Sequence, residues 1–164
     1  MTGAPNAPAE GPLQFGTREP GRDHADRPCA YGLARRADGR IALVRVVKDE
    51  GMWWDLPGGA LDPGEDEGQA LVREFIEETG LSVRPARLVA RADQFMVKTD
   101  GVAVNNRSAF YEAIIFGEDP AAKVENDHTL EWWDAADAVR ALRHDSHAWA
   151  VAAWMRLTFA DSRL

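Results

Sequence analysis

Residues 59–81 read GALDPGEDEGQALVREFIEETGL, and this stretch contains most of the chain's excess negative charge. Seven acidic residues and one arginine lie between Asp62 and Gly80, a local balance of −6, whereas the whole chain of 164 residues has a net charge of −8. Acids at positions 65–67 favour the N-terminus of a helix, and Gly80 is placed to end it. We therefore predict a helix over residues 66–79.

The predicted helix has an acidic face and an apolar face. Glu74, Glu77 and Glu78 are spaced i, i+3 and i+4, so their carboxylates are neighbours that repel one another without a cation. Arg73 can pair with Glu77, but no base is placed to neutralise the other two. A solvated acidic face is one interpretation. The better one is a divalent metal site, because carboxylate oxygens suit Mg²⁺ or Mn²⁺, and Mg²⁺ shares its ligands with substrate phosphates. The apolar face consists of Leu71, Val72, Phe75, Ile76 and Thr79.

Two other motifs fail on spacing. Gly59 and Gly64 match the glycines of a P-loop, but two acids follow where that motif needs Lys and Ser or Thr. An EF-hand beginning at Asp62 would need an oxygen ligand where Gly64 lies and a glycine where Glu67 lies. Neither a P-loop nor an EF-hand explains the acidic stretch.

The complete spacing of this stretch resembles the Nudix box. The matching positions are Gly59, Glu65, Arg73-Glu74-Phe75, Glu77-Glu78 and Gly80-Leu81, and the likeness extends back to Trp54-Asp55-Leu56-Pro57-Gly58. Phe75 departs mildly, since this position is more often aliphatic. The resemblance implies an α/β fold, an α/β/α sandwich around a mixed β-sheet. It also implies metal-dependent hydrolysis of a nucleoside diphosphate linked to a group X, which gives a nucleoside monophosphate and phospho-X.

The resemblance also implies roles for individual residues. Arg73 would act in catalysis by orienting Glu74 through a salt bridge, while Glu65 and Gly80 would support the site structurally. The cofactor would be Mg²⁺, with Mn²⁺ as a substitute. The implied metal ligands are the carbonyl of Gly59 and the carboxylates of Glu74, Glu77 and Glu78.

The general base stays open among Glu74, Glu125 and Glu131, because family members recruit it from the box helix or from a later loop. Glu131 resembles a late metal-binding glutamate of some members, and a surface acid is the alternative. For His128 we favour a solvated or hydrogen-bonded role over catalysis.

Residues that bind the rest of the substrate are harder to identify. Arg45 is either a ligand of substrate phosphate or an ordinary surface arginine. Aromatic residues in strands are more often core residues than base-stacking ones. The aromatic candidates are Phe95, Phe110 and Tyr111, with Trp53 and Trp54 expected to pack in the core or a loop.

The rest of the chain predicts strands followed by helices. Residues 29–36 and 41–47 are interpreted as a hairpin around the turn 37–40. The other expected strands are 52–56, 83–97, 102–116 and the end of 123–133; the expected helices are 135–143 and 147–160, capped by Asp134 and Ser146. The first 27 residues are interpreted as a flexible tail, and residues 28–164 as a single Nudix hydrolase domain.

Composition excludes several classes of protein. The net charge of −8 argues against broad nucleic-acid binding, and no apolar run approaches the length of a membrane span. The single cysteine, Cys29, cannot form an internal disulfide, which favours the cytoplasm. The expected partner is a small nucleotide substrate, and the apolar last helix leaves core packing and a homodimer interface both open. A catalytically silent nucleotide-sensing module is the alternative function.

Overall fold

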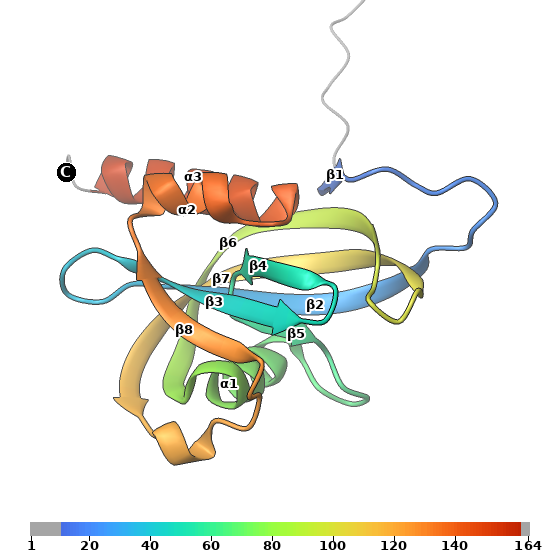
Figure 1. Cartoon of the computed structure of the whole chain (residues 1–164). Helices are drawn as coiled ribbons and strands as arrows, with labels where there is room; N and C mark the ends of the chain where they lie inside the picture. Colours follow the sequence, from blue (N-terminus) through green and yellow to red (C-terminus); the bar gives the residue numbers. More distant parts are fainter. Residues whose placement is uncertain (1–10, 162–164) are drawn as a thin grey trace, which may run out of the picture.

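The computed structural model describes residues 11–161, in which β-sheets lie between two helical layers. Helix α1 (Glu67–Thr79) covers one side, and helices α2 (Ala135–Ala141) and α3 (Asp145–Asp161) cover the other (Figure 1). The turn η1 (Pro120–Ala122) leads from the longest strands towards the last one. This arrangement confirms the predicted α/β/α sandwich.

The larger sheet is mixed and five-stranded, in the order β1-β6-β7-β2-β5. β1 runs parallel to β6 and β2 runs parallel to β7, whereas the pairs β6–β7 and β2–β5 are antiparallel. The mixed sheet was therefore predicted correctly. Its strands are β1 (Leu13–Phe15), β2 (Ala25–Ala34), β5 (Gly58–Ala60), β6 (Leu81–Val97) and β7 (Ala103–Glu118).

A second, antiparallel sheet corrects the predicted hairpin. β3 (Ile41–Lys48) lies between β4 (Gly51–Asp55) and β8 (His128–Trp133). The turn after β2 forms, but β2 and β3 then diverge, and a single bridge from Arg35 to Ile41 connects them. The reason is that Cys29–Tyr31 of β2 pair with both β7 and β5, and Val44–Val46 of β3 pair with both β4 and β8. The parts of the two strands where a longer hairpin would form therefore have no free edge.

The predicted tail was also too long. Residues 1–10 lie outside the described part of the chain, but Leu13–Phe15 pair with β6 and β2 begins at Ala25. Phe15 packs against Trp149 of α3, with ring centroids 6.2 Å apart. A three-residue strand in a Pro- and Gly-rich segment is stabilised by such long-range contacts, which composition does not reveal.

The helical layer after β8 differs in its boundaries. Asp134 caps α2 as predicted, accepting a hydrogen bond from the backbone N–H of Ala136 at 2.9 Å. Ser146, however, lies inside α3 and is not its N-cap, because the carbonyl of His144 already accepts the backbone N–H groups of residues 147 and 148. α2 ends at Ala141 rather than at residue 143, where the chain turns to bridge Leu142 to β4.

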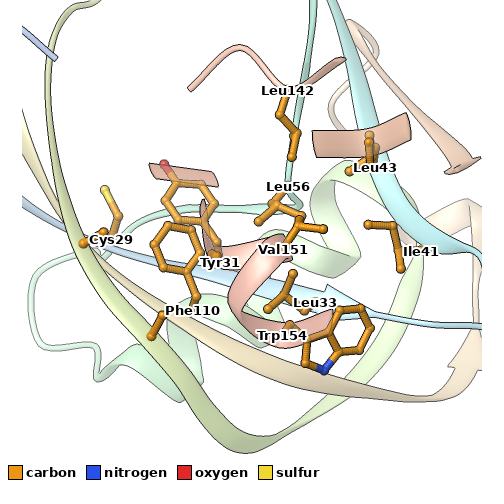
Figure 2. Close-up of a cluster of buried hydrophobic side chains, with 14 residues drawn as sticks. Cys29, Tyr31, Leu33, Ile41, Leu43, Leu56, Phe110, Leu142, Val151 and Trp154 are labelled. Atoms are coloured by element: carbon orange, nitrogen blue, oxygen red, sulfur yellow. The ribbon is translucent and has the colours of Figure 1, made fainter. Parts of the chain in front are cut away.

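Two apolar clusters hold the layers together. Phe75 and Leu71 of α1 are fully buried in the smaller cluster. Ala150, Val151 and Trp154 of α3 face the larger one, which is drawn in Figure 2. The apolar side of the last helix therefore packs in the core. None of the helices in residues 11–161 has the length and hydropathy of a membrane span.

Candidate metal and substrate site

Helix α1 is fixed at both ends by local signals. Asp66 is its N-cap: the side chain accepts the backbone N–H of Gln69 at 2.8 Å, and the Gln69 side chain accepts the backbone N–H of Asp66. Gly80 ends the helix with φ of +76°, a conformation that favours glycine. Glu74 and Glu78 are one helical turn apart and lie side by side, next to the buried Phe75.

Glu78 is buried, with 5% of its surface exposed. Its carboxylate accepts the backbone N–H of Gly58 at 3.0 Å and lies 3.3 Å from Nε2 of His128. Burial, together with the negative charges of Glu74 and Glu125, raises the pKa of Glu78 well above its ordinary value. A buried carboxylate with so few donors favours a cation beside it.

Gly59 and Glu74 are in close contact. A Cβ atom at residue 59 would lie 2.7 Å from a carboxylate oxygen of Glu74, so a side chain at residue 59 would displace this carboxylate. Burial also raises the pKa of Glu74, although Arg73 opposes this shift. Glycine at residue 59 thus lets the backbone lie directly against the Glu74 carboxylate, a group that can bind a metal ion.

Arg73 ties the loop before α1 to the helix. Its guanidinium donates to both oxygens of Glu65, at 2.7 and 2.8 Å, and to the carbonyl of Ala60 at 3.0 Å. It also contacts Glu74 at 2.9 Å and Glu77 at 3.3 Å. The hydrogen bond from Arg73 holds the pKa of Glu65 at about 2. These contacts are the ones expected if Arg73 positions Glu74 and Glu65 supports the loop.

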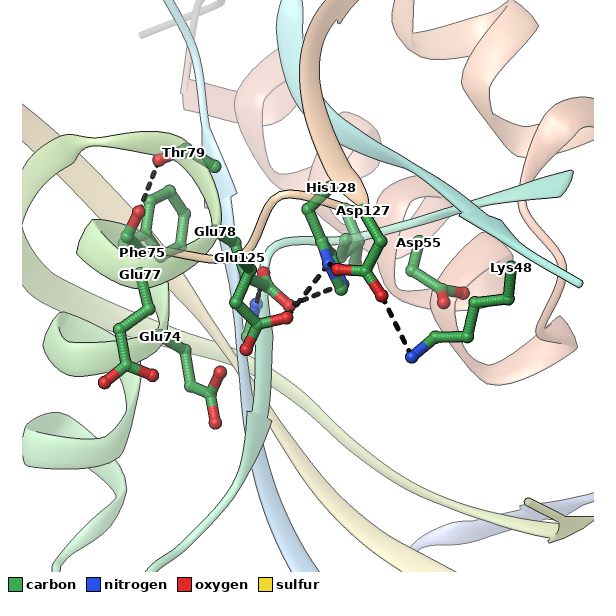
Figure 3. A network of polar contacts seen from close by, with 12 residues as sticks. Lys48, Asp55, Glu74, Phe75, Glu77, Glu78, Thr79, Glu125, Asp127 and His128 are labelled. Carbon is green, nitrogen blue, oxygen red and sulfur yellow. Dashed lines mark hydrogen bonds and ion pairs between the residues drawn. The ribbon is translucent and has the colours of Figure 1, made fainter. Parts of the chain in front are cut away.

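The loop before β8 adds Glu125 to the acidic face of α1. The backbone N–H of Glu125 donates to the carbonyl of Glu77 at 3.0 Å, which holds the loop against the helix. Figure 3 shows the carboxylates of these elements facing one another. Ligand atoms lie within 4.8 Å of one another in two overlapping groups, Glu74-Glu77-Glu125 and Glu78-Glu125-His128. Glu125 belongs to both groups and therefore joins them.

His128 lies deep in this arrangement. Its Nδ1 is 2.8 Å from a carboxylate oxygen of Asp127 and 2.9 Å from one of Glu125. Asp127 in turn pairs with Lys48 at 3.0 Å. The hydrogen-bonded role expected for His128 agrees with these contacts, which orient Glu125 and Glu78.

A pocket of about 270 Å³ opens beside the acidic group. Glu74, Glu78 and Glu125 line one part of it. In the same wall, Arg143 donates to Asp55 at 2.9 Å and lies over the Trp53 ring, 4.4 Å from its centroid. The pocket therefore combines acidic residues with cationic and aromatic ones. Its further lining residues include Arg27, Tyr31, Lys48, Lys98, Asn106 and His144.

Neither Glu131 nor Arg45 lines this pocket, which favours the alternatives to a base at Glu131 and to a phosphate ligand at Arg45. Arg45 pairs with Glu131 at 2.7 Å, and Glu131 also accepts the indole N–H of Trp54 at 2.8 Å. Glu131 is three residues after His128 on β8, so the two side chains point to opposite faces of the sheet. His128 faces the acidic group, and Glu131 therefore faces away from it.

The aromatic candidates also divide by location. Phe110 is fully buried in the core, and Phe95 packs edge-on against His24 at 5.2 Å. Tyr111 donates a hydrogen bond to Glu67. Of the aromatic residues considered from the sequence, Trp53 is the one that lines the pocket. These positions agree with the expectation that strand aromatics serve mainly in packing.

Several pocket residues were missed by the sequence analysis. Arg27 falls in the segment interpreted as a tail, and Arg143 follows a helix that was predicted to include it. Tyr31 and Arg27 both lie on β2, four residues apart, so alternation along one strand turns them to one face. Extending the first predicted strand towards the N-terminus would have placed Arg27 beside the site.

The family model described as NUDIX domain matches residues 26–155, and the chain belongs to this family. Among solved structures, the fold is similar to a NUDIX hydrolase from Nitrosomonas europaea, with a TM-score of 0.69 and 20% identity over 80% of this chain and 89% of that one.

Curated relatives match shorter stretches. An RNA pyrophosphohydrolase of Sphingopyxis alaskensis is 35% identical over 66 residues, which are 40% of this chain and 42% of the relative. A putative 8-oxo-dGTP diphosphatase of Bacillus subtilis is 67% identical over 38 residues, 23% of this chain and 26% of the relative. The chain thus spans less than half the length of these relatives.

Proposed function

We propose that this chain is a metal-dependent pyrophosphohydrolase that cleaves a nucleoside diphosphate linked to a group X, releasing a nucleoside monophosphate and phospho-X. The observation that carries this proposal is the buried carboxylate of Glu78, which is grouped with Glu125 and His128 and is joined through Glu125 to Glu74 at the edge of a pocket. The names of the relatives, a pyrophosphohydrolase and a diphosphatase, support the same class of reaction.

The residues of this group fit a hard divalent cation. Carboxylate and carbonyl oxygens are the ligands that Mg²⁺ prefers, with Mn²⁺ as a substitute. Burial disfavours negative charge on Glu78, and a cation would offset this cost. The proposed ligands are the carbonyl of Gly59 and the carboxylates of Glu74, Glu77, Glu78 and Glu125.

The surrounding residues have separate roles in the proposed reaction. A divalent ion, when bound, offsets charge that develops on the phosphoryl oxygens and favours deprotonation of the attacking water. Arg73 holds Glu74 in place, and Glu65 holds Arg73. We assign proton acceptance from water to Glu125, because its side chain is 36% exposed and can pass the proton on to solvent.

The proposed substrate is a small nucleotide, and the proposed location is the cytoplasm. Cys29 is buried and free, which suits a reducing compartment. A catalytically silent nucleotide sensor is the second candidate. That class predicts losses among Glu74, Glu77 and Glu78, whereas all three are present here. Hydrolysis is therefore the better proposal.

The test is hydrolysis of a substrate panel with Mg²⁺, with Mn²⁺ and with EDTA. The panel contains an oxidised nucleoside triphosphate, a dinucleoside polyphosphate, ADP-ribose and a nucleotide sugar. We expect metal-dependent release of a nucleoside monophosphate from at least one of them, and a loss of about 100-fold or more in kcat for Glu78→Gln.

Glu50→Gln is the matched control, since Glu50 is exposed in the β3–β4 turn. It should retain wild-type activity. Full activity of Glu78→Gln would overturn the metal site, and nucleotide binding without turnover of any substrate would favour the sensor.

A further inference from the structure

Arg27 differs from the other cations that line the pocket. Lys48 pairs with Asp127, Lys98 with Asp100 and Arg143 with Asp55, at distances of 2.7 to 3.0 Å. Among the described residues, no carboxylate forms an ion pair with Arg27. Its positive charge is therefore not balanced by a neighbouring acid.

The contacts of Arg27 hold the side chain but leave most of its donors unused. Its Nη1 donates to Oδ1 of Asn106 at 3.2 Å and to the sulfur of Cys29 at 3.6 Å. Asn106 is 3% exposed and Cys29 1%, so both partners are fixed in the core. Nε and Nη2 of the half-buried Arg27 make no hydrogen bond within the described residues, and a guanidinium presents such N–H groups in a planar fork that matches phosphate or carboxylate oxygens.

The position of Arg27 relates it to the acidic group. Arg27 and the acidic group line the same pocket, and β2 contributes Arg27 and Tyr31 to its lining. Tyr31 is paired with Gly58, beside the proposed ligand Gly59, and four strand residues span about 13 Å. The Arg27 backbone is thus displaced along the strand from the phosphates that the metal group would hold, but its side chain reaches back to the sulfur of Cys29, which is paired with Ala60 next to Gly59.

We propose that Arg27 binds an anionic group of the substrate that is additional to the two phosphates joined by the scissile bond. This inference rests on the proposed function for the location of those two phosphates. It names a class of substrate: one with a third anionic group, as in a nucleoside triphosphate or a dinucleoside polyphosphate. A nucleoside diphosphate joined to an uncharged sugar lacks this group.

Binding of analogues that resist hydrolysis tests the inference separately from turnover. Titration calorimetry with Mg²⁺ would compare α,β-methylene nucleoside triphosphate with α,β-methylene nucleoside diphosphate, for wild type and Arg27→Met. We expect Arg27→Met to weaken triphosphate binding about tenfold or more, because a charge-assisted bidentate contact is lost. Diphosphate binding should stay within about twofold.

Two further variants separate recognition from folding and from net charge. Arg27→Lys keeps the charge and a donor for Asn106, and it should restore part of the triphosphate affinity. Arg40→Met removes the same charge at an exposed turn, where the Arg40 guanidinium lies 4.0 Å from the Asp38 carboxylate, and should change neither affinity. Thermal unfolding of each variant checks that the fold is retained.

Equal weakening of both analogues in Arg27→Met, or no more weakening than in Arg40→Met, would overturn the inference. Arg27-dependent triphosphate binding in a wild type that hydrolyses no substrate would support the inference and overturn the proposed function. Turnover by wild type, with unchanged KM for every substrate in Arg27→Met, would support the function and overturn the inference.

Discussion

At the scale of single residues, the site depends on which carboxylate faces which way. Glu125 and Glu131 are six residues apart and both acidic, so composition does not distinguish them. Glu125 lies in the loop held by the carbonyl of Glu77, whereas Glu131 is on the face of β8 opposite to His128. Their neighbours differ accordingly: His128 and the carboxylates of α1 lie around Glu125, while Arg45 and two indole N–H groups lie around Glu131.

Substitution of the two residues should therefore have unequal effects on turnover. We expect Glu125→Gln to lower kcat by about 100-fold or more, because it removes a base and a proposed ligand. Glu131→Gln should retain kcat within about threefold, since Gln still accepts the indole hydrogen bonds. Steady-state kinetics on the best substrate of the panel measures both, and a larger loss for Glu131→Gln would contradict the location assigned to the base.

The contacts of Arg73 explain why a short sequence motif predicts part of the site. It contacts five groups that lie within 17 residues of one another in the sequence, from the carbonyl of Ala60 to Glu77. All of these contacts are local, so their spacing is visible in the chain before folding. Arg27 and Asn106 are 79 residues apart, and their contact becomes visible when β2 pairs with β7.

At the scale of elements, capping contacts explain why the predicted start of α1 was close to the observed one and the predicted N-cap of α3 was wrong. Asp66 caps α1, and its side chain satisfies a backbone N–H in the first turn. Ser146 has a similar place in the sequence before an apolar helix, but its hydroxyl is buried and has no hydrogen-bond partner within residues 11–161. The same residue pattern thus describes a cap in one helix and an interior residue in the other.

Stability measurements should separate these two positions. Asp66→Ala should lower the free energy of unfolding by about 1 kcal/mol, because the cap is lost, whereas Asp66→Asn should be nearly neutral. Ser146→Ala removes an unsatisfied hydroxyl and should be neutral or stabilising. Urea unfolding followed by circular dichroism measures all three variants. A loss for Ser146→Ala as large as that for Asp66→Ala would mean that Ser146 acts as a cap after all.

Much of the fold and part of the site could be predicted because their signals are local. Helix α1 begins and ends at its own capping residues, and the long strands are extended runs of the right length. The pairing of strands is not local: β2 joins β7 and β5, so the turn after Ala34 leads to another sheet instead of a hairpin. Because local spacing is visible in the sequence and tertiary pairing is not, the acids of α1 were identified, whereas Arg27 and Arg143 were not.

At the scale of the whole molecule, neighbouring cations lower the pKa values of some acidic residues, and burial raises those of others. Asp38, Glu65 and Asp127 have pKa values of about 2, because arginine, lysine or histidine neighbours stabilise their charged forms. Glu74 and Glu78 shift the other way, because burial penalises their charge. The first group contributes stability above the ordinary acid range, and that stability is lost as pH falls towards 2. The second group lowers stability as pH rises.

This opposition predicts how stability without metal depends on pH. The unfolded chain loses the proton of Glu78 near the ordinary value of 4.5, while the folded chain keeps it to a higher pH. Between these two values the unfolded state binds fewer protons, so the free energy of unfolding falls as pH rises. Glu78→Gln keeps an acceptor for the Gly58 N–H and has no proton to lose, so it should escape this part of the fall.

The measurement is the difference in Tm between Glu78→Gln and wild type in EDTA, from pH 4.5 to 8. Burial lowers the pKa of His144 to about 3, so absolute stability changes with pH in both proteins, and the difference cancels this effect. We expect Glu78→Gln to gain on wild type as pH rises, by about 3 °C or more at pH 8. Saturating Mg²⁺ should reduce the gain, because it stabilises the wild-type carboxylates. A difference that stays constant with pH would mean that the Glu78 carboxylate does not destabilise the metal-free fold.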